Sequence, residues 1–219
     1  MTKPTNPNPE EPDTSPPTHQ KSFYRRPLPS NLVDFNSAEG KSRFSSALEA
    51  GHAETFFPLI SQFQTQSHPA LCGLTTLSTI LNALQIDPKR VWNHPWRWFA
   101  ESLLDCCLNM EDMKTEGITM DQLACTAACQ GSTVRALRGL SAQDARDMIR
   151  DSARGNADGS FEFIVAAYDR QALGQTGTGH FSPIAAYDHA SDSVLVLDVA
   201  RFKVSSVFRF LLASCNRSL

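Results

Sequence analysis

Residues 61–84, SQFQTQSHPALCGLTTLSTILNAL, carry a Cys-Gly pair at the point where a polar loop gives way to an apolar-periodic segment. Pro69 prevents a helix from extending upstream, so Cys72 is expected in the first turn of the helix that follows. There the unpaired backbone N–H groups and the helix dipole favour a thiolate over a thiol. One buried helical face is predicted from apolar residues at spacings of three and four: Leu74, Leu77, Ile80, Leu81 and Leu84.

This arrangement is typical of a cysteine nucleophile. Gln66 precedes Cys72 by six residues, and its side chain could fold back across the Cys72 backbone N–H. Together these two donors would form an oxyanion hole. The alternative interpretation is a buried structural cysteine at a helix start, because free cysteines often serve as small core residues.

A histidine and an aspartate follow in the second half of the chain, within residues 174–203, GQTGTGHFSPIAAYDHASDSVLVLDVARFK. Two apolar runs separated by a polar turn predict a β-hairpin there. Paired strands lie about 5 Å apart, so His180 and Asp198 are expected at the same end of the hairpin. We expect Asp198 to accept the Nδ1 proton of His180 and leave Nε2 facing the thiol. Alternatively, His180 is an ordinary strand-end residue and Asp198 caps a turn.

Composition limits the class of protein. The 219 residues are 41% hydrophobic and 20% charged, which predicts one globular domain with a tail. A net charge of -3 argues against a nucleic-acid-binding protein, which would normally present a basic face. The sequence has neither an apolar run long enough to span a bilayer nor the apolar core of a signal peptide. We therefore expect no membrane partner and a cytoplasmic location.

The order of predicted elements indicates an α+β domain. Residues 1–22 are rich in Pro, Thr and Asn and are predicted to be a disordered Pro-rich tail. Four helices are expected over residues 37–50, 72–86, 119–129 and 141–150, with N-caps at Ser37, Thr119 and Ser141. Strands are expected from Phe161 onward. Helices first and an antiparallel sheet afterwards predict a cleft between two halves, with Cys72 facing His180 and Asp198 across it.

Four further cysteines form two tight pairs, Cys106 with Cys107 and Cys125 with Cys129. The second pair is four residues apart on one helical face, and the first could approach it to form a soft-metal thiolate site. However, the spacing is not that of a structural zinc site, and adjacent cysteines point in divergent directions. The alternative is buried cysteines in a reducing compartment. The sequence therefore predicts no dedicated metal site on the protein.

Several segments resemble the catalytic domain of eukaryotic phytochelatin synthases, a family of papain-fold transpeptidases. They include LISQFQTQSHPALCGLTTLSTILNALQIDP, WRWFAESLLDCC, EGITMDQLAC and QTGTGHFSPIAAY with LDVARFK, and the similarity spans residues 23–203. The resemblance implies a papain-like α+β fold, in which Cys72 is the nucleophile and His180 the base. It also implies Asp198 as the orienting acid and Gln66 as the oxyanion donor. The Cys-Gly and Cys-Trp signature of papain itself is absent, which fits a distant branch of that fold.

The resemblance also implies a reaction. Cys72 would attack the Cys-Gly peptide bond of glutathione, release glycine and carry a γ-glutamylcysteinyl thioester. The amine of a second glutathione or of a growing phytochelatin would then displace the thioester. These substrates are anionic, and the family's basic positions carry over to Arg170, Arg201 and Lys203. Arg201 could instead pack near Thr65 and support the loop that carries Gln66.

Metal enters this expected reaction with the substrate, as cadmium, zinc or copper held in a metal-glutathione thiolate. Soft thiolates select such metals. The resemblance implies no organic cofactor and no metal cage on the protein, and the cellular outcome would be metal-chelating peptides. Metal preference and oligomeric state, a homodimer included, stay open.

Residues 204–219, VSSVFRFLLASCNRSL, depart from the family pattern, and we interpret them as a divergent, truncated C-terminus. Within them, 204–213 are apolar enough for a replacement strand or helix. Reduced stability and activity are expected. Two other functional hypotheses remain: a hydrolase of glutathione or its conjugates that uses the same residues, and an inactive truncated protein that binds metal through its other thiols.

Overall fold

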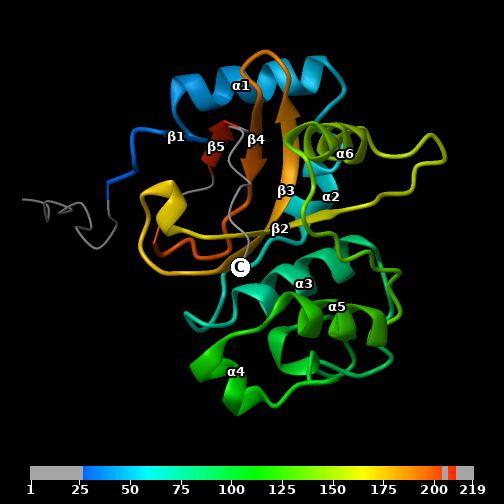
Figure 1. Ribbon diagram of the computed structural model, residues 1–219. Helices are drawn as coiled ribbons and strands as arrows, with labels where there is room; N and C mark the ends of the chain where they lie inside the picture. Colours follow the sequence, from blue (N-terminus) through cyan, green and yellow to red (C-terminus); the bar gives the residue numbers. More distant parts are fainter. Residues whose placement is uncertain (1–26, 204–206, 211–219) are drawn as a thin grey trace, which may run out of the picture.

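An antiparallel sheet in the order β1-β5-β4-β3-β2 forms the centre of the fold (Figure 1). The computed structural model describes residues 27–203 and 207–210, so the predicted tail at 1–22 lies outside the described residues. Within the described residues the strands are β1 (Leu32–Asp34), β2 (Ile164–Tyr168), β3 (His180–Asp188), β4 (Ser193–Val196) and β5 (Val207–Phe210). The helices are α1 (Ala38–Glu49), α2 (Phe56–Ser61), α3 (Cys72–Ala83), α4 (Met110–Glu116), α5 (Met120–Cys129) and α6 (Ala142–Arg154), with short 3-10 turns η1 (Glu101–Leu103) and η2 (Gln171–Leu173).

The helices fall into two groups around the sheet. In Figure 1, α3, α4 and α5 gather on one side of the molecule, while α1 and α6 lie toward the other end of the strands. Both α3 and α6 pack against the long strand β3, as does α1. This arrangement is the predicted α+β architecture, a helical half packed against an antiparallel half, and it is compatible with a papain-like fold.

Helix starts follow the predicted caps. The Ser37 hydroxyl accepts from the Gly40 backbone N–H, and Ser141 accepts from Asp144. Thr119 and Gln122 form a reciprocal capping box at the start of α5. The helix ends agree less closely. The helix predicted to reach about Ile86 ends at Ala83, close to Gln85, which has a left-handed conformation. Helix α6 extends beyond its predicted end at Arg150 to Arg154, and Gly155, with a positive φ, ends it.

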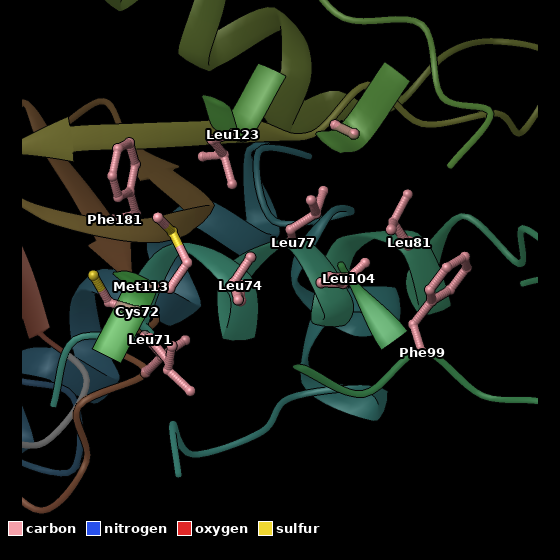
Figure 2. Packing of buried hydrophobic residues seen from close by; sticks show 12 residues of the cluster. Leu71, Cys72, Leu74, Leu77, Leu81, Phe99, Leu104, Met113, Leu123 and Phe181 are labelled. Atoms are coloured by element: carbon pink, nitrogen blue, oxygen red, sulfur yellow. The ribbon is translucent and has the colours of Figure 1, made fainter. Parts of the chain in front are cut away.

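Helix α3 is buried more completely than its periodicity predicts. Every residue from Cys72 to Asn82 is buried, rather than the single expected face, because β3 covers one side of the helix and α5, α2 and η1 cover others. Figure 2 shows its leucines packed with Phe99, Leu104 and Leu123 in one cluster. Burial of each such leucine contributes about 1.5–3 kcal/mol, so α3 and the cysteine at its head are firmly held.

The predicted hairpin is present as β3 and β4, and all nine residues of β3 are buried. The strand expected over 161–168 is shorter and begins at Ile164. Of the replacement strand or helix considered for 204–213, the structure contains a strand, β5, which lies between β1 and β4 in the sheet. Among the described residues, no helix is both long and apolar enough to cross a membrane.

Candidate active site

Cys72 is the first residue of α3, and the chain before it makes a tight turn. The Leu71 backbone N–H donates to the His68 carbonyl at 3.0 Å, and Pro69 lies in this turn. Cys72 is only 7% exposed and lies at one end of the core cluster beside Leu71 and Met113 (Figure 2). The predicted position of the sulfur at a helix start is therefore confirmed.

His180 reaches this sulfur from the opposite half of the molecule. It is the first residue of β3, is 4% exposed, and its imidazole is hydrogen-bonded to the Cys72 side chain. The Tyr168 ring lies edge-on to the imidazole with ring centroids 5.5 Å apart. The helical half and the sheet thus bring together the two residues that the sequence predicts as nucleophile and base.

The orientation of the imidazole differs from the prediction. His180 Nε2, rather than Nδ1, lies 2.8 Å from Asp198 Oδ1, which leaves Nδ1 for the Cys72 sulfur. The reason lies in the position of the sulfur, which also accepts from the backbone N–H of Phe181. The sulfur therefore lies close to the start of β3, on the side of the imidazole nitrogen that the bond to Asp198 leaves free.

Asp198 is a buried carboxylate with three donors. Its Oδ1 accepts from His180 and from the Ala200 backbone N–H, and its Oδ2 accepts from Arg170 Nη1, each at 2.8 Å. Asp198 and Arg170 are each 1% exposed. Because charge-assisted hydrogen bonds to both oxygens fix the carboxylate, the aspartate in turn fixes the imidazole plane.

The three groups shift one another's pKa values. Burial raises the pKa of the Cys72 thiol, but hydrogen bonds from His180 and from the Phe181 and Gly73 backbones outweigh it, so the pKa is lowered. Burial lowers the pKa of His180, yet its bonds to Asp198 and Cys72 raise it overall. Burial raises the pKa of Asp198, but the hydrogen bond and charge of His180, together with the charge of Arg170, lower it overall. These directions favour a thiolate–imidazolium pair.

Gln66 is buried in the loop before α3, and its side-chain amide is partly engaged. Its side chain is buried, its Nε2 donates to the His68 carbonyl at 2.8 Å, and its backbone N–H donates to the Val199 carbonyl at 3.0 Å. The amide NH₂ has a second hydrogen for an oxyanion. The bond to Val199 ties the Gln66 loop to the segment that carries Asp198.

The three predicted substrate-binding cations occupy different environments. Arg170 is buried and paired with Asp198, which favours a role in positioning that carboxylate, whereas its predicted role in substrate binding stays a prediction. Arg201 is exposed, and its guanidinium lies over the Phe63 ring at 5.5 Å. Lys203 is half-buried, and its Nζ lies close to Gly177. Lys203 and Arg201 remain the candidates for direct contact with an anion.

Sequence reasoning missed Glu101, from η1. Its carboxylate accepts from the Ser67 backbone N–H at 3.1 Å and also from the hydroxyls of Ser67 and Thr75. It therefore joins the loop that carries Gln66 to the first turn of α3. No local pattern signals this role, because Glu101 lies 26 residues beyond Thr75 and meets it only in the folded chain.

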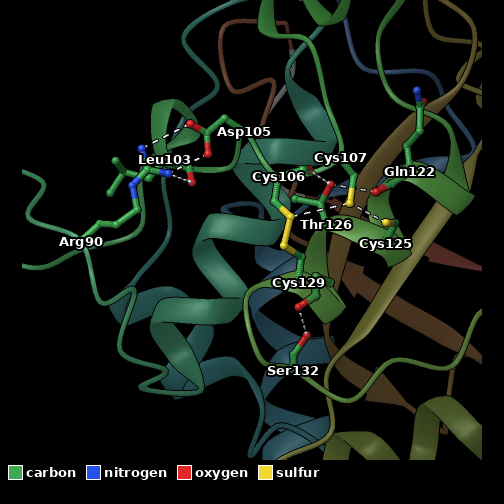
Figure 3. The surroundings of a disulfide bond; sticks show 11 residues. Arg90, Leu103, Asp105, Cys106, Cys107, Gln122, Cys125, Thr126, Cys129 and Ser132 are labelled. Carbon is green, nitrogen blue, oxygen red and sulfur yellow. Dashed lines mark hydrogen bonds and ion pairs between the residues drawn. A yellow bond between two sulfur atoms is a disulfide. The ribbon is translucent and has the colours of Figure 1, made fainter.

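The other described cysteines lie together, with Cys106 partly buried and the rest exposed, which contradicts the alternative of buried cysteines in a reducing compartment. Cys106 and Cys129 form a disulfide, and Cys107 Sγ lies 2.6 Å from Cys125 Sγ (Figure 3). Cys107 and Cys125 are exposed. The expectation that adjacent cysteines diverge is also wrong, because the Sγ atoms of Cys106 and Cys107 are 3.7 Å apart.

This fold, with a cysteine at a helix start facing a histidine and an aspartate from a sheet, is compatible with the papain-like class of cysteine enzymes. The chain belongs to the phytochelatin synthase family, whose sequence profile matches residues 23–211. The family predicted from sequence resemblance is thereby confirmed.

Relatives of this chain include plant and fungal proteins. It is 50% identical over 183 residues to glutathione gamma-glutamylcysteinyltransferase 1 of Arabidopsis thaliana, an alignment covering 83% of this chain and 37% of that protein. It is 40% identical over 187 residues to glutathione gamma-glutamylcysteinyltransferase of Schizosaccharomyces pombe, covering 84% of this chain and 44% of the relative. The chain thus spans less than half the length of these curated relatives.

Proposed function

We propose that this chain is a γ-glutamylcysteinyl transpeptidase that acts on glutathione through a thioester on Cys72. The observation that carries the proposal is the buried connection from Cys72 through His180 to Asp198, in which the pKa of the thiol is lowered and that of the imidazole is raised. The names of the curated relatives point to the same activity.

In the first half-reaction, the Cys72 thiolate attacks the carbonyl of the Cys-Gly peptide bond of glutathione. The oxyanion is stabilised by the second amide hydrogen of Gln66 and the Cys72 backbone N–H at the start of α3. His180 then transfers its proton to the departing glycine amine. Asp198 holds the imidazole in position throughout, and Arg170 holds Asp198.

In the second half-reaction, neutral His180 removes a proton from the α-amine of an incoming glutathione or phytochelatin. The amine attacks the thioester, and Cys72 leaves as a thiolate that is again paired with imidazolium. The acceptor carries carboxylates, for which Arg201 and Lys203 are the proposed partners. Cadmium, zinc or copper would arrive as a glutathione thiolate, as substrate or activator, without an organic cofactor.

We further propose that the protein works in the cytosol, where glutathione is abundant and reduced. One chain supplies all the catalytic residues described here, so the proposed chemistry does not require a homodimer. Neither nucleic acid nor membrane is a proposed partner, in keeping with the net charge of -3.

The test is incubation of the purified chain with glutathione and cadmium, followed by mass spectrometry of the products. Oligomers of γ-Glu-Cys support the transpeptidase. Release of γ-Glu-Cys and glycine alone would instead indicate a hydrolase with the same residues. Mass spectrometry of acid-quenched protein should detect an acyl adduct on Cys72 that Cys72→Ser lacks. Without the adduct and without products, both enzymatic interpretations fail, and the metal-thiol binding alternative remains.

A further inference from the structure

We propose that Tyr168, at the end of β2, is a positioning residue that holds the His180 imidazole in place between the nucleophile and Asp198. Tyr168 is not among the site residues expected from the sequence, and it donates or accepts no proton in the proposed reaction. The inference rests on the proposed function, because it concerns the base of that reaction. It adds a residue that acts on this base through packing.

Strand pairing places Tyr168 directly beside the base. Tyr168 is the last residue of β2 and is paired with His180, the first residue of the adjacent antiparallel strand β3 (Figure 1). Side chains directly opposite each other in such a pair lie on the same face of the sheet, with Cβ atoms about 4.5–5.5 Å apart. The two rings lie edge to face, with centroids 5.5 Å apart and an interplanar angle of 81°. Aromatic rings favour this arrangement, so the imidazole has a fixed packing partner along one side.

The hydroxyl of Tyr168 is fixed by Ser182. The two side-chain oxygens are hydrogen-bonded at 3.2 Å, and Ser182 is fully buried. Because Ser182 follows His180 by two residues on β3, its side chain lies on the same face of the sheet as the imidazole. The Tyr168 ring therefore extends from the imidazole to the next side chain on that face. Its Cα is held by the strand and its oxygen by the serine, so the ring has little freedom to turn away.

Apolar packing also limits movement of the ring. Tyr168 packs against a pair of buried leucines, Leu32 of β1 and Leu173 of η2. Tyr168 is itself only partly buried, whereas His180 is 4% exposed. A partly exposed ring next to a buried imidazole forms part of the wall between that imidazole and solvent. Loss of the ring would therefore both loosen the imidazole and admit water to it.

The same end of β2 supports the carboxylate that orients the base. Arg170 follows Tyr168 by two residues, and its Nη1 donates to Asp198 at 2.8 Å. Asp198 in turn is hydrogen-bonded to His180 Nε2 at 2.8 Å. One short stretch of chain, residues 168–170, thus supports both partners of the His–Asp hydrogen bond, the imidazole by packing and the carboxylate by charge.

Tyr168 supplies this packing without adding a charge. Burial raises the pKa of the Tyr168 phenol, and the negative charge of Asp198 raises it further, so the side chain stays neutral. A neutral ring competes neither with Asp198 for the imidazolium nor with the imidazolium for the thiolate. A leucine in its place would be equally neutral, but it could not be fixed by a hydrogen bond to Ser182. The aromatic ring and the hydroxyl therefore have separate effects that substitutions can separate.

The experiment observes the His180–Asp198 hydrogen bond directly, in the full chain without glutathione. The bonded proton gives a downfield proton NMR signal, assigned by its absence in His180→Gln, and its exchange with water reports how firmly the imidazole is held and covered. We expect exchange at least about tenfold faster in Tyr168→Leu and a smaller increase in Tyr168→Phe, which keeps the ring. Tyr187→Phe is the matched control. It removes a tyrosine hydroxyl, bonded to Asp192, at the other end of β3 and should leave exchange unchanged.

Kinetics with glutathione and cadmium provide the second measurement. We expect kcat to fall at least about tenfold in Tyr168→Leu with KM little changed, because Tyr168 acts through the base and not on the substrate. Ser182→Ala should match Tyr168→Phe, and the variant with both changes should be no worse than either, since all three lack the same hydrogen bond. If Tyr168→Leu fails to fold, the two hydroxyl variants decide, and unchanged exchange and kcat in both would overturn the proposal.

The two measurements distinguish this proposal from the proposed function. Faster exchange in Tyr168→Leu, in a parent that makes no transpeptidation product, would support the role of Tyr168 while the proposed function fails. An active parent whose exchange and kcat match those of Tyr168→Leu would overturn the role of Tyr168 alone. A variant with a lower melting temperature but unchanged exchange and kcat would show that the tyrosine is merely structural. Absence of the downfield signal from the parent would show that the imidazole is not held, which also overturns the proposal.

Discussion

Cys72 begins a helix and is hydrogen-bonded to His180, and both features stabilise the thiolate over the thiol. A serine in its place keeps the size but not the acidity, because a hydroxyl is not ionised by these neighbours. We expect Cys72→Ser to lower the rate of glycine release about 10⁴-fold or more while changing the melting temperature little. Glycine release and circular dichroism melts measure the two quantities. A residual rate within about tenfold of the parent would contradict a covalent role.

The paired pKa shifts predict a pH window of activity. Because the pKa of Cys72 is lowered, the thiolate persists to lower pH, and activity falls only when acidity protonates it. Because the pKa of His180 is raised, activity falls on the basic side when the imidazolium loses its proton. Asp198→Asn removes a cause of that raised pKa, so the basic limb should move to lower pH. The pH profile of kcat/KM tests this, with the exposed Asp158→Asn as control.

The role of Arg170 can be separated from substrate binding. Its salt bridge with Asp198 is fully buried, and removal of one partner from such a pair costs about 3–5 kcal/mol. Arg170→Met should therefore lower the free energy of unfolding in urea as well as kcat, and Arg170→Lys should recover part of both. A substrate-binding arginine would instead raise KM and leave unfolding unchanged.

The same pair links stability to pH. The folded-state pKa of Asp198 is depressed, so its contribution to stability is present above the unfolded value of about 3.9 and is lost as the pH falls through the lower folded value. His180 is the larger cause of this depression and Arg170 a smaller one, so urea unfolding at neutral and acid pH should show that Arg170→Met removes only part of this acid-dependent loss.

Among the elements, η1 and the turn before α3 form one unit through Glu101. The Glu101 carboxylate orders the Gln66 loop, because it accepts hydrogen bonds from Ser67 and Thr75. Glu101→Gln keeps the shape but loses the charge, and an amide donor then faces hydroxyl donors. We expect kcat to fall about tenfold with the melting temperature little changed, since small displacements at a catalytic centre are costly.

The exposed Glu111→Gln, on the surface of α4, is the matched control for this experiment and should leave kcat unchanged. An unchanged kcat in Glu101→Gln would show that the turn before α3 holds its shape without the hydrogen bonds that the Glu101 carboxylate accepts. A large fall in melting temperature would indicate that Glu101 serves the fold rather than the loop.

Elements that local chemistry specifies could be predicted from the sequence. Pro69 and the leucine spacing place the start of α3 at Cys72, and Thr119 with Gln122 caps α5 as expected. The orientation of the His180 ring could not be predicted, because it depends on how close the Cys72 sulfur comes to the β3 backbone. The burial of Arg170 likewise depends on a partner 28 residues away.

The packing of α3 on β3 joins the two halves of the molecule, and hydrogen bonds beside the catalytic residues cross the same interface. The hydrogen bond from the Gln66 backbone to Val199 links the loop before α3 to the segment after β4, and Thr76 on α3 donates to the Phe181 carbonyl of β3 at 3.1 Å. Both lie beside the catalytic residues. The position of the nucleophile relative to the base is therefore set by the packing of one half on the other, rather than by either half alone.

Strand β5 completes the sheet, and it lies within residues 23–211, which the family profile matches, although 204–219 were expected to depart from the family pattern. It pairs with β1 through Leu32–Asp34 and with β4 through Ser193–Val196, so its loss would leave β1 unpaired and expose one edge of β4, which would still pair with β3. At about 0.5–1.5 kcal/mol for each hydrogen bond, removal should cost several kcal/mol. A chain ending at Lys203 should therefore unfold at lower urea concentration than one ending at Phe210, which retains β5.

This pair of truncations also tests the expectation of an unstable C-terminus. If β5 stabilises the sheet, the chain that ends at Phe210 unfolds in urea in one cooperative transition. The chain that ends at Lys203 then has a lower urea midpoint, and its free energy of unfolding depends less steeply on urea concentration. Activity should fall in parallel, because β4 leads directly into Asp198 and an unpaired β4 edge would loosen that carboxylate. Equal midpoints for the two chains would mean that β1 and β4 hold their positions without β5.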